Sequence, residues 1–181
     1  MLRARKSVHA RDNRKDSPLI DFHVITLTGK PRINGTAVRN AKALELAYLL
    51  SVSDSPRSFA IGKREACLQL YGSHHSPNVA WYAVRGCRMH GIDIKYDRGA
   101  SCYYSDKPIY SDLQKSFESL RAGDVEQALF FVSGPVLPGV SDAFADKIRQ
   151  ELDMEIADVL RALPEGQHPR ITSCMESRRI G

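Results

Sequence analysis

The segment 76–91, SPNVAWYAVRGCRMHG, sorts its side chains onto two contrasting faces of a helix. Ser76 is a good N-cap, Pro77 suits the first helical turn, and Gly91 suits a left-handed C-cap. At about 100° per residue, one face is small and apolar while the other is polar and aromatic. The first face holds Val79, Ala80, Ala83, Val84 and Cys87, and the second holds Asn78, Trp81, Tyr82, Arg85, Arg88 and Met89. The fold must therefore provide a core for the small face.

The polar face of this helix has the side chains that read DNA. Arginine and asparagine have the fork geometry that suits guanine and adenine edges in the major groove. We therefore predict a recognition helix in which Asn78, Arg85 and Arg88 reach base edges. Trp81 and Tyr82 are expected to touch a thymine methyl group or a sugar. An ordinary amphipathic surface helix is the alternative.

The elements around this helix predict a winged helix-turn-helix. Residues 21–28 alternate as a strand, with Phe22, Val24 and Thr26 on one face, and Asn34-Gly35 is a strong hairpin signal that completes a small antiparallel sheet. Helices are expected over 41–52 and 62–71, and after Gly91 a β-hairpin turns at 97–99. This order is that of a winged helix, whose third helix enters the groove. Lys95 and Arg98 of the hairpin would then lie near phosphates.

The second half of the chain is predicted to be helical. Apolar stripes indicate helices over 112–121, 123–132 and 142–163, with a stiff connector at 134–139. The fold class is therefore α+β, with four regions along the chain. These are a disordered basic arm (1–18), a winged-helix DNA-binding domain (19–111), a small all-α, tetratricopeptide-like activator-type domain (112–163) and a flexible tail (164–181).

Charge divides along the same boundary. Residues 1–111 contain 18 Lys or Arg against 9 Asp or Glu, whereas residues 112–163 contain 5 against 10. A basic half favours a polyanionic partner, here double-stranded DNA, and an acidic half favours a different task. The basic arm either lies along phosphates or merely keeps the chain soluble.

Several functional classes are not indicated by the sequence. No apolar run approaches the roughly 18 residues of a membrane span, and no hydrophobic segment follows the basic N-terminus, so we expect neither membrane insertion nor secretion. Four scattered cysteines form no CxxC pair, and the spacing of Cys87 and His90 lacks a second pair, so we expect no metal and no cofactor. No motif pairs a nucleophile with a base, so we expect no enzyme.

Five stretches of the sequence resemble one bacterial family. They are GKPRINGTAV (29–38), KALELAYL (42–49), GDVEQAL (123–129), GPVLPG (134–139) and DAFA (142–145). Over about residues 20–163 the chain resembles transcriptional activators of the SARP type, the antibiotic-regulatory-protein family, which join an OmpR-like winged helix to a bacterial transcriptional activator domain. The resemblance implies a cytoplasmic, nucleoid-associated regulator whose helical half serves assembly or contacts RNA polymerase.

Two expectations follow for partners. The family's helical domain usually continues through several helix pairs, and this chain has about three helices, so we predict that residues 112–163 cover their apolar stripes by forming a homodimer. Packing of these helices against the chain's own winged helix, which the opposite net charges of the two halves would favour, is the competing solution. The main alternative to DNA binding is a winged helix used for protein–protein contact. In that case Trp81, Tyr82, Met89 and the arginines would form a binding hot spot, a composition typical of interfaces.

Overall fold

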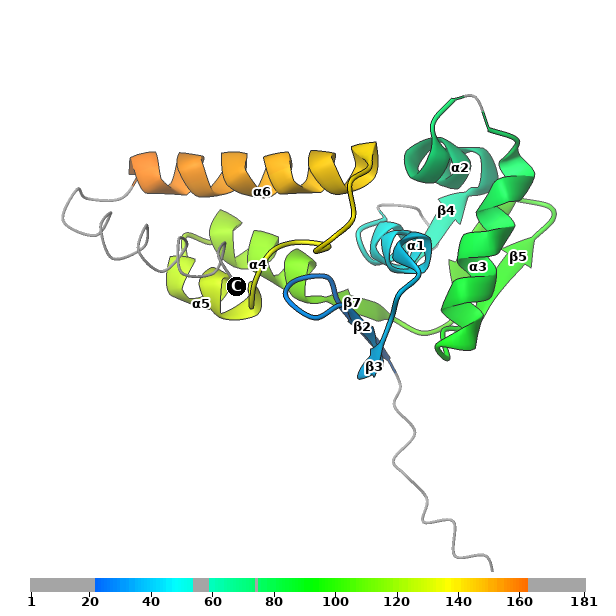
Figure 1. Ribbon diagram of the computed structural model, residues 1–181, viewed down its shortest axis with the longest axis horizontal. Coiled ribbons are helices and arrows are strands. Elements are labelled where there is room, and N and C mark those ends of the chain that lie inside the picture. The colour runs from blue at the N-terminus through cyan, green and yellow to red at the C-terminus, as the bar shows by residue number, and fades with distance from the viewer. Residues whose placement is uncertain (1–21, 54–58, 74, 163–181) are drawn as a thin grey trace, which may run out of the picture.

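The computed structural model describes residues 22–53, 59–73 and 75–162, and this part of the chain is α+β, as predicted (Figure 1). The predicted arm (1–18) and tail (164–181) lie outside the described residues. The helices are α1 (Ala41–Ser51), α2 (Lys63–Tyr71), the 3₁₀ turn η1 (Pro77–Val79), α3 (Ala80–Met89), α4 (Asp112–Arg121), α5 (Val125–Phe131) and α6 (Ala143–Ala162). The strands are β1 (His23–Thr26), β2 (Arg32–Ile33), β3 (Thr36–Ala37), β4 (Ala60–Gly62), β5 (Ile94–Asp97), β6 (Cys102–Ser105) and β7 (Ile109–Ser111).

The first sheet has the strand order β3-β2-β1-β7. The hairpin predicted at Asn34-Gly35 is confirmed, and both residues have positive φ, as a tight hairpin turn requires. The strand β7 was not predicted. It pairs in parallel with β1, so that His23 lies opposite Ile109, and the sheet is therefore not purely antiparallel.

The face of β1 that enters the core is the opposite of the one suggested by the pattern. Ile25 and Leu27 are fully buried, whereas Phe22 and Val24 are each 43% exposed. Both faces of this strand carry large apolar side chains, so alternation alone cannot choose between them. The contact with α1 decides, because it covers the Ile25 face.

Helix α1 lies at the middle of the molecule, between α2 and α3 on one side and the helices α4 and α6 on the other (Figure 1). Asn40 caps its N-terminus, because its Oδ1 accepts a hydrogen bond from the Ala43 amide at 3.3 Å. Its own side chains Leu44, Leu46 and Leu50 are buried. The buried residues on either side of position 112 form one continuous apolar cluster, so the two halves share a core.

The second sheet has the order β4-β6-β5. Its hairpin, β5–β6, is the one predicted after Gly91, and it pairs Tyr96 with Tyr103 and Asp97 with Cys102. The edge strand β4 was not predicted, because three residues between a loop and a helix give no periodic signal. Ile94 is fully buried, whereas Tyr96, two residues farther out along the hairpin, is 41% exposed.

The three predicted C-terminal helices are confirmed, but their apolar stripes are covered within a single chain. Helix α6 packs along α4 (Figure 1), and Tyr48 of α1 meets Phe144 edge to face with 6.3 Å between ring centres. Of the predicted α6 stripe, Phe144, Ile148, Leu152 and Ile156 are buried and Val159 is partly buried, while Leu163 lies outside the described residues. Packing within the chain, the competing solution, covers this stripe, so the homodimer remains a prediction without that support.

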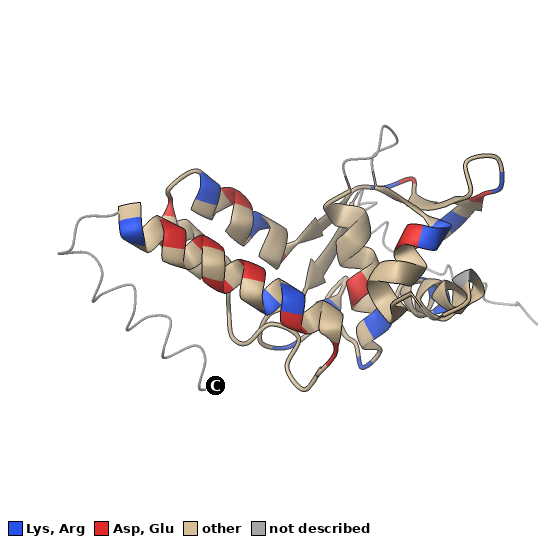
Figure 2. Ribbon diagram, turned by 90° about the horizontal axis from the view of Figure 1, so that it is seen from above, with Lys and Arg blue, Asp and Glu red and all other residues tan. Residues whose placement is uncertain are grey.

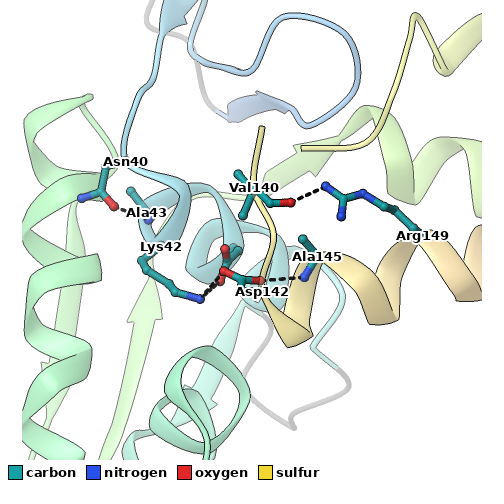
Figure 3. Close-up of polar contacts among 8 residues, drawn as sticks. Asn40, Lys42, Ala43, Val140, Asp142, Ala145 and Arg149 are labelled. Carbon is teal, nitrogen blue, oxygen red and sulfur yellow. Dashed lines mark hydrogen bonds and ion pairs between the residues drawn. The ribbon is translucent and has the colours of Figure 1, made fainter. Parts of the chain in front are cut away.

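Two carboxylates tie the helical half to the first half. Asp112, at the start of α4, accepts hydrogen bonds from the amides of Leu27 (2.9 Å) and Thr28 (3.0 Å) and from the Thr28 hydroxyl (2.7 Å). Asp142 caps α6 through the Ala145 amide and pairs with Lys42 Nζ at 2.8 Å (Figure 3). The orientation of α4 and α6 on the first half is thus fixed by charged hydrogen bonds as well as by packing.

No helix in the described ranges is both long enough and apolar enough to cross a membrane.

Candidate nucleic-acid interface

The helix α3 is held closely against α1 by its face of small residues. Ala80, Ala83, Val84 and Cys87 are buried, as the sequence predicted. Gly86 is also buried in this contact, and a Cβ atom there would lie 2.8 Å from Ala43 Cβ, closer than real contacts allow. Burial raises the pKa of Cys87 to about 12, which keeps it a neutral thiol that donates to the Ala43 carbonyl at 3.2 Å.

A short 3₁₀ turn precedes the α-helical part of this segment. Ser76 Oγ accepts from the Asn78 amide at 3.4 Å, and the chain passes through the 3₁₀ turn η1 before α3 begins at Ala80. The predicted N-cap is therefore confirmed, with a tighter first turn than expected. Asn78 consequently lies at the start of the helix, where its Oδ1 accepts from Lys63 Nζ at 2.8 Å.

The opposite face of α3 is exposed, as predicted. Trp81 is 48% exposed, Tyr82 64% and Met89 75%. Trp81 and Tyr82 meet edge to face with 5.7 Å between ring centres, and the Arg85 guanidinium carbon lies 5.8 Å from the centre of the Trp81 ring. An arginine over an indole gains a cation–π attraction without losing its access to solvent. The outer face therefore presents one guanidinium and two rings as a unit.

Arg88 differs from Arg85, although both lie on the exposed side. The Arg88 guanidinium binds the Ile94 carbonyl of β5 through Nε, at 2.9 Å, and through Nη2. These bonds fasten the end of α3 to the hairpin. Gly91 has a φ of 84°, the left-handed conformation expected of it, and it turns the chain toward β5. Arg88 thus fastens α3 to the hairpin, and its expected role as a base reader stays a prediction.

A groove of about 590 Å³ separates α3 from the β5–β6 hairpin. Of the predicted site residues, Asn78, Trp81, Tyr82 and Arg88 line it, whereas Arg85, Lys95 and Arg98 do not. The lining comprises Lys63, Asn78, Val79, Trp81, Tyr82, Val84, Arg88, Tyr96 and Tyr103. The groove is therefore mostly aromatic and aliphatic, with two cations and one amide.

Five lining residues are not among the predicted site residues: Val79 and Val84, which were predicted on the apolar face of the helix, and Lys63, Tyr96 and Tyr103. Lys63 is the first residue of α2, and its Nζ lies 5.8 Å from the centre of the Tyr96 ring. Tyr96 and Tyr103 face each other across the hairpin, with 5.2 Å between ring centres. The aromatic pair could have been found from the hairpin register, but Lys63 reaches the groove only because α2 packs beside η1.

The cations of the hairpin have different environments. Lys95 forms an ion pair with Asp106, and both side chains remain substantially exposed. Hydrogen bonding to Asp106 raises the pKa of Lys95, so the amine stays charged at neutral pH. Arg98 is exposed in the turn between β5 and β6. Both can reach a polyanion, although Lys95 must first exchange its partner.

Charge is segregated over the surface. Figure 2 shows Asp and Glu positions along most of the long helix α6, with Lys or Arg positions near both of its ends, on the side of the molecule away from the β5–β6 hairpin. A second groove, of about 670 Å³, lies between α1, α4 and α6, and its lining includes Glu118, Glu151, Glu155 and Asp158. Within the described ranges, no group of three or more His, Cys, Asp or Glu side chains is placed to hold a metal ion.

No protein-family model matches the chain, and no match was found among curated proteins or among solved structures.

Proposed function

We propose that this chain is a sequence-specific double-stranded DNA-binding transcription regulator. In this proposal, residues 22–111 act as a winged helix, with α3 in the major groove and the β5–β6 hairpin as the wing. One observation carries the proposal: α3 is anchored to α1 by small buried residues and to β5 by Arg88, while Arg85 and two aromatic rings face outward. A helix presented in this way has the rigidity and donors that reading a groove requires.

The individual roles follow from the contacts. Arg85 is the primary base reader, because it is exposed and, among the described residues, is held only by the Trp81 ring. Asn78 contributes an adenine contact when its Oδ1 releases the hydrogen bond from Lys63 Nζ and accepts one from the base edge instead. Arg98 and Lys95 neutralise phosphates and so position the protein without specifying sequence.

The resemblance to SARP-type activators supplies the remaining parts of the proposal. The helical region would contact RNA polymerase or a second copy of the chain, and the protein would act at the nucleoid. The carboxylates along α6 favour a partner with a basic surface.

The test is selection of genomic fragments by the purified protein at two salt concentrations, followed by affinity measurements on the selected site. Arg85→Ala should reduce affinity about 5- to 150-fold, the equivalent of the roughly 1–3 kcal/mol of a lost bidentate base contact. Arg161→Ala, a change in an exposed arginine of α6, is the matched control and should leave binding unchanged. Undiminished affinity of Arg85→Ala would remove α3 from the recognition role.

The wing is tested separately with Arg98→Ala. Because phosphate contacts carry no sequence information, this variant should weaken binding to all sequences about equally and flatten the salt dependence by about one unit of slope. An altered sequence preference at unchanged slope would contradict the assignment of the hairpin as a wing.

A protein-binding module is the second candidate function. It is favoured by the exposure of Trp81, Tyr82 and Met89 on one helix, since large apolar side chains of this kind are enriched at interface hot spots. Salt separates the two candidates. DNA affinity falls steeply as salt rises, whereas a contact anchored by apolar side chains changes little.

A further inference from the structure

Reading a duplex leaves the flat faces of the aromatic rings on and beside α3 without a task, even where a ring touches a thymine methyl group or a sugar. Major-groove readout uses hydrogen bonds to base edges, and the flat faces of stacked bases are not accessible there. Yet four rings, those of Trp81, Tyr82, Tyr96 and Tyr103, line the groove between α3 and the hairpin. Trp81, Tyr82 and Tyr96 are between 41% and 64% exposed, so part of each ring is accessible to a ligand.

Cations are interleaved with these rings. Lys63 Nζ lies 5.8 Å from the Tyr96 ring centre, and the Arg85 guanidinium lies 5.8 Å from that of Trp81. Arg88 also lines the groove, at its junction with β5. A stacked base brings its phosphates within a few ångströms, so a site for unstacked nucleotides needs positive charge beside each aromatic surface. Lys63 lies in the groove beside Tyr96, whereas Arg85 lies just outside it, against the Trp81 ring that lines it.

The shape of the groove suits a strand rather than an enclosed small molecule. Its volume of about 590 Å³ lies within the range of ligand sites, roughly 300–1,000 Å³. One wall is the helix α3 and the other is the β5–β6 hairpin, and the groove is open to solvent rather than enclosed. Extended single strands are bound by such basic grooves, in which bases stack on aromatic side chains regardless of sequence.

We propose that this groove binds single-stranded DNA by stacking unpaired bases on Trp81, Tyr82 and Tyr96, with Lys63 and Arg85 on the phosphates. The inference rests on the proposed function, because it assigns a second form of DNA to the same face. Duplex and single strand then compete for α3. A duplex containing a short unpaired segment engages both kinds of contact and binds more tightly than a fully paired one.

The chain contains a single tryptophan, which makes the test direct. Full-length protein is titrated with the ten-nucleotide strand dT10 and with a ten-unit abasic strand that has the same phosphates and no bases. We expect dT10 to quench the fluorescence of Trp81 and to bind at least about tenfold more tightly than the abasic strand, because each base stacked on an aromatic ring adds affinity. Equal affinity for the two strands would overturn the proposal.

Substitutions locate the site. Tyr82→Leu and Tyr96→Leu should each reduce dT10 affinity about tenfold and leave abasic-strand affinity unchanged. Tyr110→Leu is the control, because Tyr110 is 38% exposed on the other sheet and should have no effect. Tyr82 is the more exposed residue, so its variant tests stacking even if Tyr96→Leu unfolds the hairpin. Unchanged dT10 affinity in a folded Tyr82→Leu variant would overturn the proposal.

The two proposals fail in distinguishable ways. Duplex affinity for the selected site is measured by fluorescence anisotropy on the same protein preparations. Duplex binding that depends on Arg85, together with no preference of dT10 over the abasic strand, refutes the single-strand site alone. Tight dT10 binding without any duplex selectivity refutes the proposed regulator and leaves the aromatic groove as the binding surface.

Discussion

A methyl group at position 86 would test whether close helix contact sets the position of α3. Gly86 faces α1, and a Cβ atom there would lie 2.6 Å from Asn40 Nδ2 and 2.8 Å from Ala43 Cβ. The Asn40 side chain can rotate away, but it is the N-cap of α1 and its Oδ1 accepts from the Ala43 amide. Ala43 Cβ cannot move without its helix. Gly86→Ala therefore forces either a lost cap or a wider spacing between the helices.

The expected loss of stability follows from opposing contributions. Alanine is favoured over glycine inside a helix by about 1 kcal/mol. Overpacking a tight core contact costs about 1–3 kcal/mol, and loss of an Asn cap costs about 0.5–2 kcal/mol. Together these costs of about 1.5–5 kcal/mol exceed the gain, so we expect Gly86→Ala to lower the free energy of unfolding by about 0.5–4 kcal/mol.

A double-mutant cycle separates this steric effect from helix propensity. The free energy of unfolding is measured by urea denaturation for Gly86→Ala, Ala43→Gly and the double variant. Ala43→Gly removes the Cβ that the new methyl group would meet, so the cost of Gly86→Ala should be smaller in that background by about 1 kcal/mol or more. Strictly additive costs, or a stabilised Gly86→Ala protein, would refute the reasoning.

Three further predictions concern the contacts between the two halves. Burial raises the pKa of Glu45 to about 7, above its value in the unfolded chain, so ionisation of this carboxyl opposes folding. The free energy of unfolding should therefore fall by about 2–3 kcal/mol between pH 5 and pH 8, relative to that of Glu45→Gln. A difference between the two proteins that does not change with pH would contradict this. Asp112→Ala leaves the buried amides of Leu27 and Thr28 without their acceptor, and should lower the free energy of unfolding by roughly 2–5 kcal/mol in urea denaturation, with a smaller loss for Asp112→Asn. Ile148→Ala should lower the free energy of unfolding by about 2–5 kcal/mol. This loss should be the same at low and high protein concentration, because the apolar side of α6 is covered within the chain. A loss that varies with protein concentration would show that a second copy covers it.

The order of the elements was largely predictable from local patterns. The Asn34-Gly35 hairpin, the helices from α1 to α6 and the β5–β6 hairpin were all expected, with bounds within a few residues. Each has a strong local signal, either a turn that needs positive φ or an apolar stripe at helical spacing. The strands β4 and β7 were missed, because three-residue strands have no periodicity and take their structure from distant partners.

The candidate site was predictable only in part. The exposed face of α3 followed from helical geometry, so Trp81, Tyr82 and Arg85 lie where the sequence placed them. The partners of Arg88 and Lys95 could not be predicted from helical geometry. The Ile94 carbonyl meets Arg88 only because the hairpin folds back on α3, and Asp106 meets Lys95 through the pairing of β5 with β6.

The sequence by itself determined which residues form helices and which side of each helix is apolar, since both depend on spacing along the chain. Tertiary structure alone decided what covers each apolar side. The stripe on α6 packs on α4 and on Tyr48 of the same chain, although its sequence equally suited a second copy. Lys63 likewise joins the groove through the packing of α2 beside η1. Periodicity records that a face must be buried, but the burial partner depends on contacts between residues far apart in the chain.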